Sequence, residues 1–164
     1  NIFHKHCDRV QMANIAQTVN VLQAMILTDK EKMLLTPTYH VFEMFKRHQD
    51  ATLLPAYLQC GDYTFGRDKI PALNASASRD KNGKVLVTVC NLDPNQKQEL
   101  QCEIRGMNAR NVRARVLSAD TITAHNTFDK PEQVKPEPFN DFQKTDSGIT
   151  ASLPSKSVVA FEIE

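Results

Sequence analysis

Residues 9–50, RVQMANIAQTVNVLQAMILTDKEKMLLTPTYHVFEMFKRHQD, decide the fold, because this stretch is dense in apolar residues and carries signals for a strand, a hairpin and a helix. The polar tripeptide Asp29-Lys30-Glu31 separates an apolar run at 21–28 from a second run at 32–36, and this pattern predicts a hairpin with a short turn. Upstream, Val10–Asn14 predicts a short buried strand, which follows the last turns of a helix that we expect to end near Asp8.

A second helix is predicted immediately after the hairpin. Thr36 places a hydroxyl at the N-cap position. Pro37 stands at the first helical position, where the backbone N–H that proline lacks would have no hydrogen-bond partner within the helix. Val41, Phe42 and Phe45 then recur at helical spacing, so we expect this helix to continue to about residues 48–50.

Beyond Asp50 the apolar period changes from helical to two, which indicates β-strands. Val85, Val87 and Val89 alternate with residues that are also largely apolar, so we expect this strand to be central and covered on both faces. The preceding Asn82-Gly83 predicts a hairpin turn, because this pair tolerates positive φ. The remaining alternating runs predict an antiparallel β-sandwich, with further strands at 73–77, 100–104, 112–116, 149–153 and 157–164. Residues 125–145 are polar and predict a long loop with room for one edge strand.

The composition excludes several classes of function. The 20 basic and 19 acidic residues give a net charge of +1, which predicts no nucleic-acid partner and no anionic membrane surface. No apolar run approaches the roughly 20 residues of a membrane span. The first ten residues have neither the apolar core nor the cleavage site of a signal peptide. The cysteines show no metal-ligand spacing, and we expect all to be free thiols: Cys7, Cys60, Cys90 and Cys102.

No metal or cofactor site is predicted from the residues. His4 and His6 lie two positions apart, so on a helix their side chains point about 200° apart and cannot bind one metal ion together. His40 and His48 fall in the second predicted helix, and we expect them to be surface or packing residues. The five glycines form no phosphate-binding loop.

Three segments of the N-terminal third resemble one enzyme family. They are His6–Val10 (HCDRV), Met12–Gln23 (MANIAQTVNVLQ) and Leu35–Met44 (LTPTYHVFEM), and they are similar to the C-terminal part of the catalytic domain of glycoside hydrolase family 51, the α-L-arabinofuranosidases. The family usually has alanine at the position of Cys7. The ending Leu153–Val159 (LPSKSVV) resembles the family's C-terminal β-sandwich more loosely.

This resemblance implies a division of the chain into two parts. Residues 1–50 would be the last strand, hairpin and helix of a truncated (β/α)8 catalytic barrel, and residues 51–164 would be the C-terminal β-sandwich. Without the rest of a barrel, we expect the first part to be poorly packed, repacked on the sandwich, or buried in an oligomer. The family's sandwich also takes strands from the start of the full chain, so we expect an unfilled sheet edge.

The resemblance also implies one substrate-binding residue, Gln17. This residue lies just past the predicted strand Val10–Asn14, at the end of a barrel strand where such enzymes carry their active sites. In the family, a glutamine in this Ala-Gln context hydrogen-bonds the arabinofuranosyl ring. An amide suits that role because it offers donors and an acceptor to sugar hydroxyls. The alternative is that the Gln17 side chain satisfies backbone groups of its own loop.

The family's reaction is retaining hydrolysis by two glutamates, a general acid/base and a nucleophile, whose carboxyl groups are about 5 Å apart. Neither is placed in this chain. The acid/base of the family follows an asparagine, and this sequence has no Asn-Glu dipeptide. The nucleophile precedes the last barrel strand by more residues than this chain has before Val10. We therefore expect an inactive C-terminal part of an enzyme that removes terminal α-L-arabinofuranosyl residues.

The resemblance implies an arabinofuranosyl-containing saccharide as the substrate, no cofactor, and a homo-oligomeric parent enzyme. The alternative is that residues 51–164 form a carbohydrate-binding module without catalysis. Such modules usually stack sugar rings on exposed tryptophan or tyrosine. This chain has no tryptophan, and its tyrosines all precede the main run of strands, which disfavours the alternative: Tyr39, Tyr57 and Tyr63.

Overall fold

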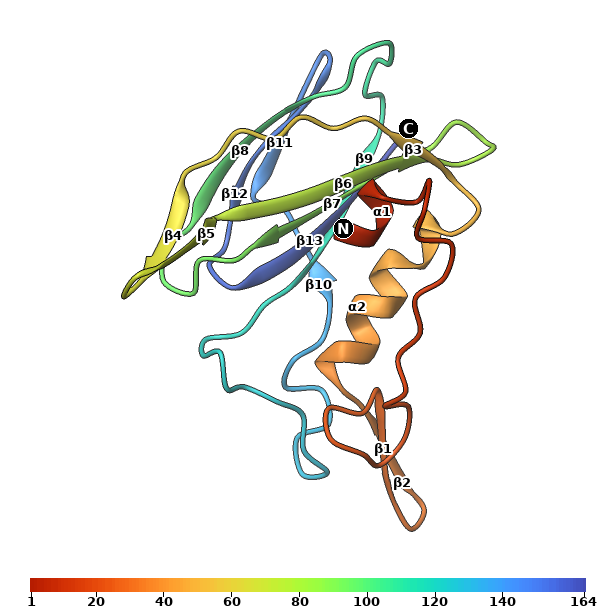
Figure 1. Cartoon of the computed structure of the whole chain (residues 1–164), viewed down its shortest axis with the longest axis vertical. Helices are drawn as coiled ribbons and strands as arrows, with labels where there is room; N and C mark the ends of the chain where they lie inside the picture. The colour runs from red at the N-terminus through yellow and green to blue at the C-terminus, as the bar shows by residue number, and fades with distance from the viewer.

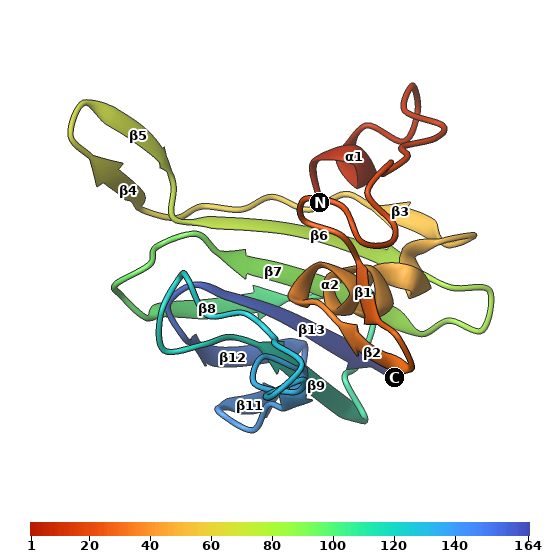
Figure 2. The same cartoon turned by 90° about the horizontal axis from the view of Figure 1, so that it is seen from below.

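Two antiparallel β-sheets form the body of the molecule (Figures 1 and 2). The computed structural model describes all residues from Asn1 to Glu164. The larger sheet has six strands in the order β10-β9-β13-β7-β6-β3, and the smaller has three in the order β11-β12-β8. The predicted mainly-β fold is thereby confirmed. The strand bounds are β3 Thr52–Leu54, β6 Leu73–Arg79, β7 Val85–Asn91, β8 Gln98–Glu103, β9 Val112–Leu117, β10 Glu137–Pro138, β11 Phe142–Thr145, β12 Gly148–Leu153 and β13 Ser157–Ile163.

The main core lies between these two sheets. Val159, Phe161 and Ile163 of β13 alternate inward and are completely buried, as the period-two pattern predicts. From the smaller sheet, Ile149 and Leu153 are also completely buried and belong to the same core cluster. Burial of apolar side chains at this density supplies the main stabilisation of a sandwich of this size.

The outer face of the six-stranded sheet is covered by the N-terminal segment. Helix α1 (Ile2–Lys5), helix α2 (Pro37–Phe45) and a 3₁₀ turn (Lys46–His48) lie on this side of the sheet (Figure 2). Met44 of α2 is buried against a second cluster formed by Leu86, Leu117, Val134 and Ala160. The predicted two-sided burial of β7 is confirmed, and α2 is packed on the sandwich. No helix has the length and apolarity that crossing a membrane requires.

The predicted strand at Val10–Asn14 is wrong. This segment has no regular secondary structure, and residues 11–14 are exposed. A β-strand needs a neighbouring backbone to receive its hydrogen bonds, and no strand of this chain pairs with the segment. The helix before it is also shorter than predicted, because α1 ends at Lys5 and continues only as turns to Arg9.

Two hairpins extend from the packed layers. The predicted hairpin is confirmed as β1 (Ile26–Asp29) and β2 (Lys32–Leu35), although residues 21–24 form a turn instead of the start of β1. A second hairpin that the pattern did not predict, β4 (Asp62–Phe65) and β5 (Asp68–Pro71), projects from one end of the sandwich (Figure 1). The loop at 125–145 contains β10 and β11, one strand more than expected.

We predict that Met44→Ala lowers the free energy of unfolding of this chain by about 2–5 kcal/mol, because it leaves a cavity between α2 and the outer face of the sheet. Met44 is 2% exposed. Urea denaturation measures the change. Phe42→Ala is the matched control on the same helix, since Phe42 is 47% exposed, and its expected effect is about 1 kcal/mol or less. Equal effects of the two substitutions would contradict the packing of α2 on the sheet.

Candidate functional site

The segment that carries Gln17 lies along the edge of the β1–β2 hairpin. The Gln17 carbonyl accepts a hydrogen bond from Met25 N at 3.1 Å, and the Thr18 carbonyl accepts one from Ile26 N at 3.0 Å. Val19 forms a parallel bridge with Ile26. The hairpin therefore sets the position of the Gln17 backbone.

The side chain of Gln17 is half-buried and makes no hydrogen bond within the chain. Its amide therefore does not serve the loop backbone, which was the alternative to a ligand-binding role. Asn20 does this work for the loop instead: it has a φ of +53°, its Nδ2 donates to Thr28 Oγ1 at 2.8 Å, and its Oδ1 accepts from Thr28 N at 2.7 Å. The saccharide-binding role of Gln17 stays a prediction.

Thr36 is at the predicted N-cap position, but its hydroxyl does not cap the helix. The Thr36 Oγ1 donates instead to the carbonyls of Ala24, at 2.7 Å, and Met25, at 3.2 Å. Its backbone N also donates to the Met25 carbonyl, at 3.0 Å. The hydroxyl proton is directed to these carbonyls because the chain that enters β1 returns beside the start of α2. Thr36 thus connects the helix to the loop after Gln17.

Asn126 connects the sandwich to the same hairpin, and no sequence pattern singled it out. It lies in the long excursion between β9 and β10, which runs beside α2 toward β1 and β2 (Figure 1). The Asn126 Nδ2 donates to the Leu35 carbonyl at 2.8 Å and to the Val134 carbonyl at 2.9 Å. Its Oδ1 accepts from Val134 N at 2.7 Å. The sequence predicts only a polar loop here, because the hairpin partner is 91 positions away.

A second polar cluster lies where the N-terminal segment meets the sheet. His48 contacts Ser78 Oγ through Nδ1 at 2.7 Å and Thr88 Oγ1 through Nε2 at 2.9 Å. His4 stacks on His48 with 4.3 Å between ring centroids, and its Nδ1 lies 2.9 Å from Ser76 Oγ. Burial, followed by the neighbouring His4, lowers the pKa of His48 to about 3. His48 is therefore a neutral packing residue, in line with the prediction for it.

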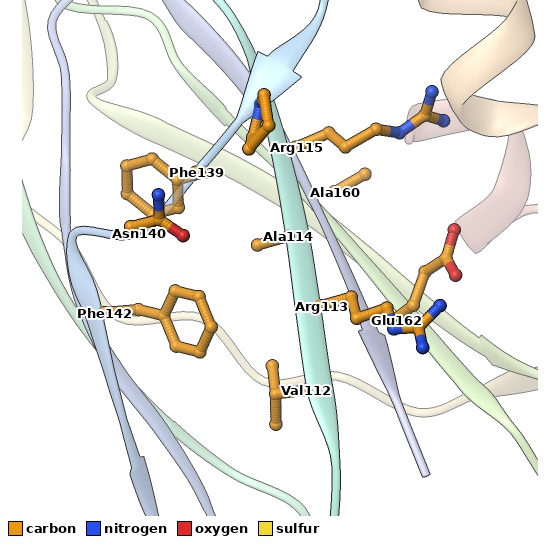
Figure 3. Close-up of a pocket in the computed structure, with 10 residues that line it drawn as sticks. Val112, Arg113, Ala114, Arg115, Phe139, Asn140, Phe142, Ala160 and Glu162 are labelled. Atoms are coloured by element: carbon orange, nitrogen blue, oxygen red, sulfur yellow. The ribbon is translucent and has the colours of Figure 1, made fainter.

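A groove of about 370 Å³ lies beside β9, where the chain crosses from one sheet to the other (Figure 3). Phe139 and Phe142 lie on the inner side of β9, and Arg113, Arg115 and Glu162 lie on the other side. Glu162 is paired with Arg47 at 2.6 Å. The groove brings no two carboxyl groups together, so it lacks the pair that glycoside hydrolysis needs.

The two carboxyl groups whose pKa is displaced are paired with lysines at the surface. A general acid needs a raised carboxyl pKa. The pKa of Glu132 and that of Glu164 are both lowered, because Lys135 and Lys84 donate hydrogen bonds to them. All four cysteines are free, as predicted. Burial raises the pKa of the Cys90 and Cys102 thiols, which makes them poor nucleophiles.

Comparison with known proteins places the chain in a family. The model of the alpha-L-arabinofuranosidase C-terminal domain matches residues 1–157. The chain belongs to this family. An intracellular exo-alpha-L-arabinofuranosidase of Bacteroides ovatus is 41% identical over 100% of this chain and 32% of its own length. An intracellular exo-alpha-(1->5)-L-arabinofuranosidase of Bifidobacterium longum is 26% identical over 96% of this chain and 30% of its own length.

Solved structures of family members agree with this assignment. The GH51 arabinofuranosidase from Xanthomonas axonopodis pv. citri superposes with a TM-score of 0.96 and 42% identity, over 99% of this chain and 33% of that chain. A family 51 alpha-L-arabinofuranosidase from Bifidobacterium longum superposes with a TM-score of 0.85 and 26% identity, over 99% of this chain and 32% of that chain. This C-terminal-domain chain spans about a third of the length of the relatives that it matches.

We predict that acid destabilises the chain through His48. Its ordinary pKa of 6.5 is lowered to about 3 in the folded chain, so between these values the unfolded chain binds a proton that the folded chain does not. The free energy of unfolding then falls as the pH falls through this window, and His48 has no effect above it. Urea unfolding at about pH 7.5 and about pH 4.5 measures the loss.

His48→Asn should make this loss of stability smaller, because the titrating group is gone. His125→Asn is the matched control, since His125 is exposed and lies away from the sheet cluster. The same acid-dependent loss in His48→Asn and in the unsubstituted chain would show that His48 is not the residue responsible.

Proposed function

We propose that this chain is the C-terminal part of a retaining α-L-arabinofuranosidase, which removes terminal α-L-arabinofuranosyl residues from polysaccharides or oligosaccharides that contain arabinose. The observation that carries this proposal is the match along the chain to the Xanthomonas GH51 arabinofuranosidase, with a TM-score of 0.96 at 42% identity. The relatives from Bacteroides and Bifidobacterium that match nearly the whole chain are named as exo-acting arabinofuranosidases. The proposed substrate is therefore an arabinofuranosyl-containing saccharide.

In this proposal both catalytic glutamates belong to a part of the enzyme outside this chain. Residues 1–50 would complete the catalytic barrel, and residues 51–164 would be the accessory β-sandwich. Two observations support this division: the chain matches only about a third of each relative, and the groove beside β9 has Glu162 as its single carboxyl group. The chain by itself is then without hydrolytic activity.

Gln17 is the residue of this chain that we assign to the substrate. Its side-chain amide has no partner within the chain, although its backbone is held firmly by Met25. A fixed backbone with a free amide suits a group that must donate to one sugar hydroxyl and accept from another. Gln17 would line the subsite of the arabinofuranosyl ring, and the glutamates would approach from the rest of the barrel.

The smaller sheet of the sandwich has an open edge at β8. A cleft of about 680 Å³ lies between the segment at 54–58 and the inner faces of β6, β7 and β8. Strand β8 is the end strand of its sheet, so one row of its backbone groups has no strand partner. We infer that an upstream strand of the parent enzyme fills this edge.

We predict that the parent enzyme hydrolyses an aryl α-L-arabinofuranoside and that this chain alone does not. In the parent, Gln17→Ala should lower kcat/KM by roughly 10- to 100-fold, because a buried sugar hydroxyl loses its hydrogen-bond partner. Release of the aryl group measures the rate. Gln143→Ala is the matched control, since Gln143 is an exposed amide on β11 in the sandwich.

The outcomes of this experiment separate the parts of the proposal. Activity of this chain alone would mean that the catalytic carboxylates lie within it. A folded parent without activity would remove the substrate assignment. Full activity of Gln17→Ala would remove only the role of Gln17.

We also propose that the parent enzyme is a homo-oligomer. The observation in favour is the β4–β5 hairpin, which projects from the sandwich with Phe65 73% exposed and Ile70 44% exposed. Exposed apolar side chains on a projecting element are typical of a protein interface. Sedimentation velocity of the parent should give a multiple of the protomer mass, and Phe65→Ser should shift it toward smaller species. A monomeric parent would refute this part.

A further inference from the structure

We propose that Asn126 is a positioning residue for Gln17: its buried amide in the β9–β10 excursion of the sandwich holds the β1–β2 hairpin, and the hairpin holds the Gln17 backbone. The structural part of this inference stands on the hydrogen bonds of this chain. Its consequence for catalysis rests on the proposed function of Gln17.

The Asn126 amide is fully engaged and almost completely buried, at 4% exposure. One Nδ2 hydrogen goes to the Leu35 carbonyl at the end of β2, and the other goes to the Val134 carbonyl. The Oδ1 accepts from Val134 N and so closes the excursion on itself. The side chain thus makes one hydrogen bond to the hairpin and two to Val134, whose own side chain is buried against the outer face of the larger sheet. Because water has little access here, loss of these bonds is not compensated.

From Leu35 a short run of backbone contacts leads to Gln17. Thr36, the next residue, donates its backbone N to the Met25 carbonyl at 3.0 Å. The backbone N of Met25 in turn donates to the Gln17 carbonyl at 3.1 Å. Three hydrogen bonds therefore connect Asn126 to Gln17. The peptide bond between Leu35 and Thr36 joins the first to the second, and Met25 joins the second to the third.

The hairpin needs such an anchor from outside. A two-stranded hairpin is marginally stable by itself in water, and here it must also carry the segment of Gln17 on its edge. A substrate contact that shifts by about 1 Å can cost roughly 100-fold in rate. The excursion from the sandwich is long enough to reach the hairpin, and Asn126 donates a hydrogen bond to the Leu35 carbonyl at the end of β2.

The competing explanation is that Asn126 only stabilises the fold of the excursion. Asn91 is a matched control for that explanation. It is 3% exposed, its Oδ1 accepts from Asp93 N at 3.0 Å, and its Nδ2 donates to backbone carbonyls that include Gln96 O at 2.9 Å and Pro154 O at 2.8 Å. It has the same kind of bonds but lies within the sandwich, with no contact to the hairpin.

The first experiment measures hydrogen–deuterium exchange of this chain. Asn126→Asp keeps the shape and the acceptor but replaces both donors by an oxygen that faces two carbonyls. We expect the amides of Met25, Ile26 and Thr36 to exchange roughly ten-fold faster or more, and we expect no such change in Asn91→Asp. Unchanged exchange at these amides in folded Asn126→Asp would overturn the proposal. If that variant does not fold, Asn126→Ala is measured with Asn91→Ala under the same criterion.

The second experiment is a double-mutant cycle on kcat/KM in the parent enzyme. Asn126→Ala should lower kcat/KM roughly ten-fold in the unsubstituted enzyme and by less than about two-fold in a Gln17→Ala background, because it acts through Gln17. Asn91→Ala should lower the Tm without this loss in kcat/KM. A purely structural role would instead give equal effects in both backgrounds, and this result would overturn the proposal.

The two experiments fail separately. If the parent has no arabinofuranosidase activity, the proposed function fails, and the exchange measurement still decides whether Asn126 holds the hairpin. If activity is present but exchange at Met25 and Thr36 is unchanged, the proposed function stands and the role of Asn126 fails.

Discussion

The whole arrangement depends on the two-sided burial of the central strands of the larger sheet. Val85, Val87 and Val89 of β7 face the smaller sheet, and Leu86 on the other face is also buried. A strand with apolar side chains on both faces needs another layer of the protein packed against each face. The smaller sheet supplies one cover, and α2 supplies the other through Met44. This requirement joins the N-terminal segment that carries α2 to the sandwich.

Apolar packing brings α2 to the sheet, and polar contacts determine how it lies there. Arg115 of β9 makes a two-pronged contact with Glu43, at 2.9 and 3.3 Å. Partly exposed ion pairs of this kind add little stability, but they select one orientation. The oriented helix starts at Thr36, which bonds to the loop that enters β1. A contact made by the sandwich is in this way transmitted toward Gln17.

The sequence predicted well where the pattern is local. The hairpin turn, the proline-led start of α2 and the alternating strands 85–89 and 159–163 needed only neighbouring residues. Val10–Asn14 was predicted wrongly because an apolar run describes a strand only if another strand lies beside it. In the candidate site, Gln17 came from resemblance. Asn126 had no signal, because its partners are a loop carbonyl and a distant hairpin.

The sequence by itself determined the family, the mainly-β class and the elements from the β1–β2 hairpin to α2, since periodicity, turn residues and family motifs are all read along the chain. Only the tertiary structure decided that α2 covers the outer face of the larger sheet. The same holds for the Thr36 hydroxyl, which bonds to the carbonyls of Ala24 and Met25 instead of capping its helix. It also holds for the His48 imidazole, which hydrogen-bonds to side chains on both β6 and β7. These choices depend on which unpaired donors and acceptors meet when distant segments pack. Hydrogen bonds between residues that are far apart in the sequence produce no periodic pattern along the chain, so sequence patterns do not predict them.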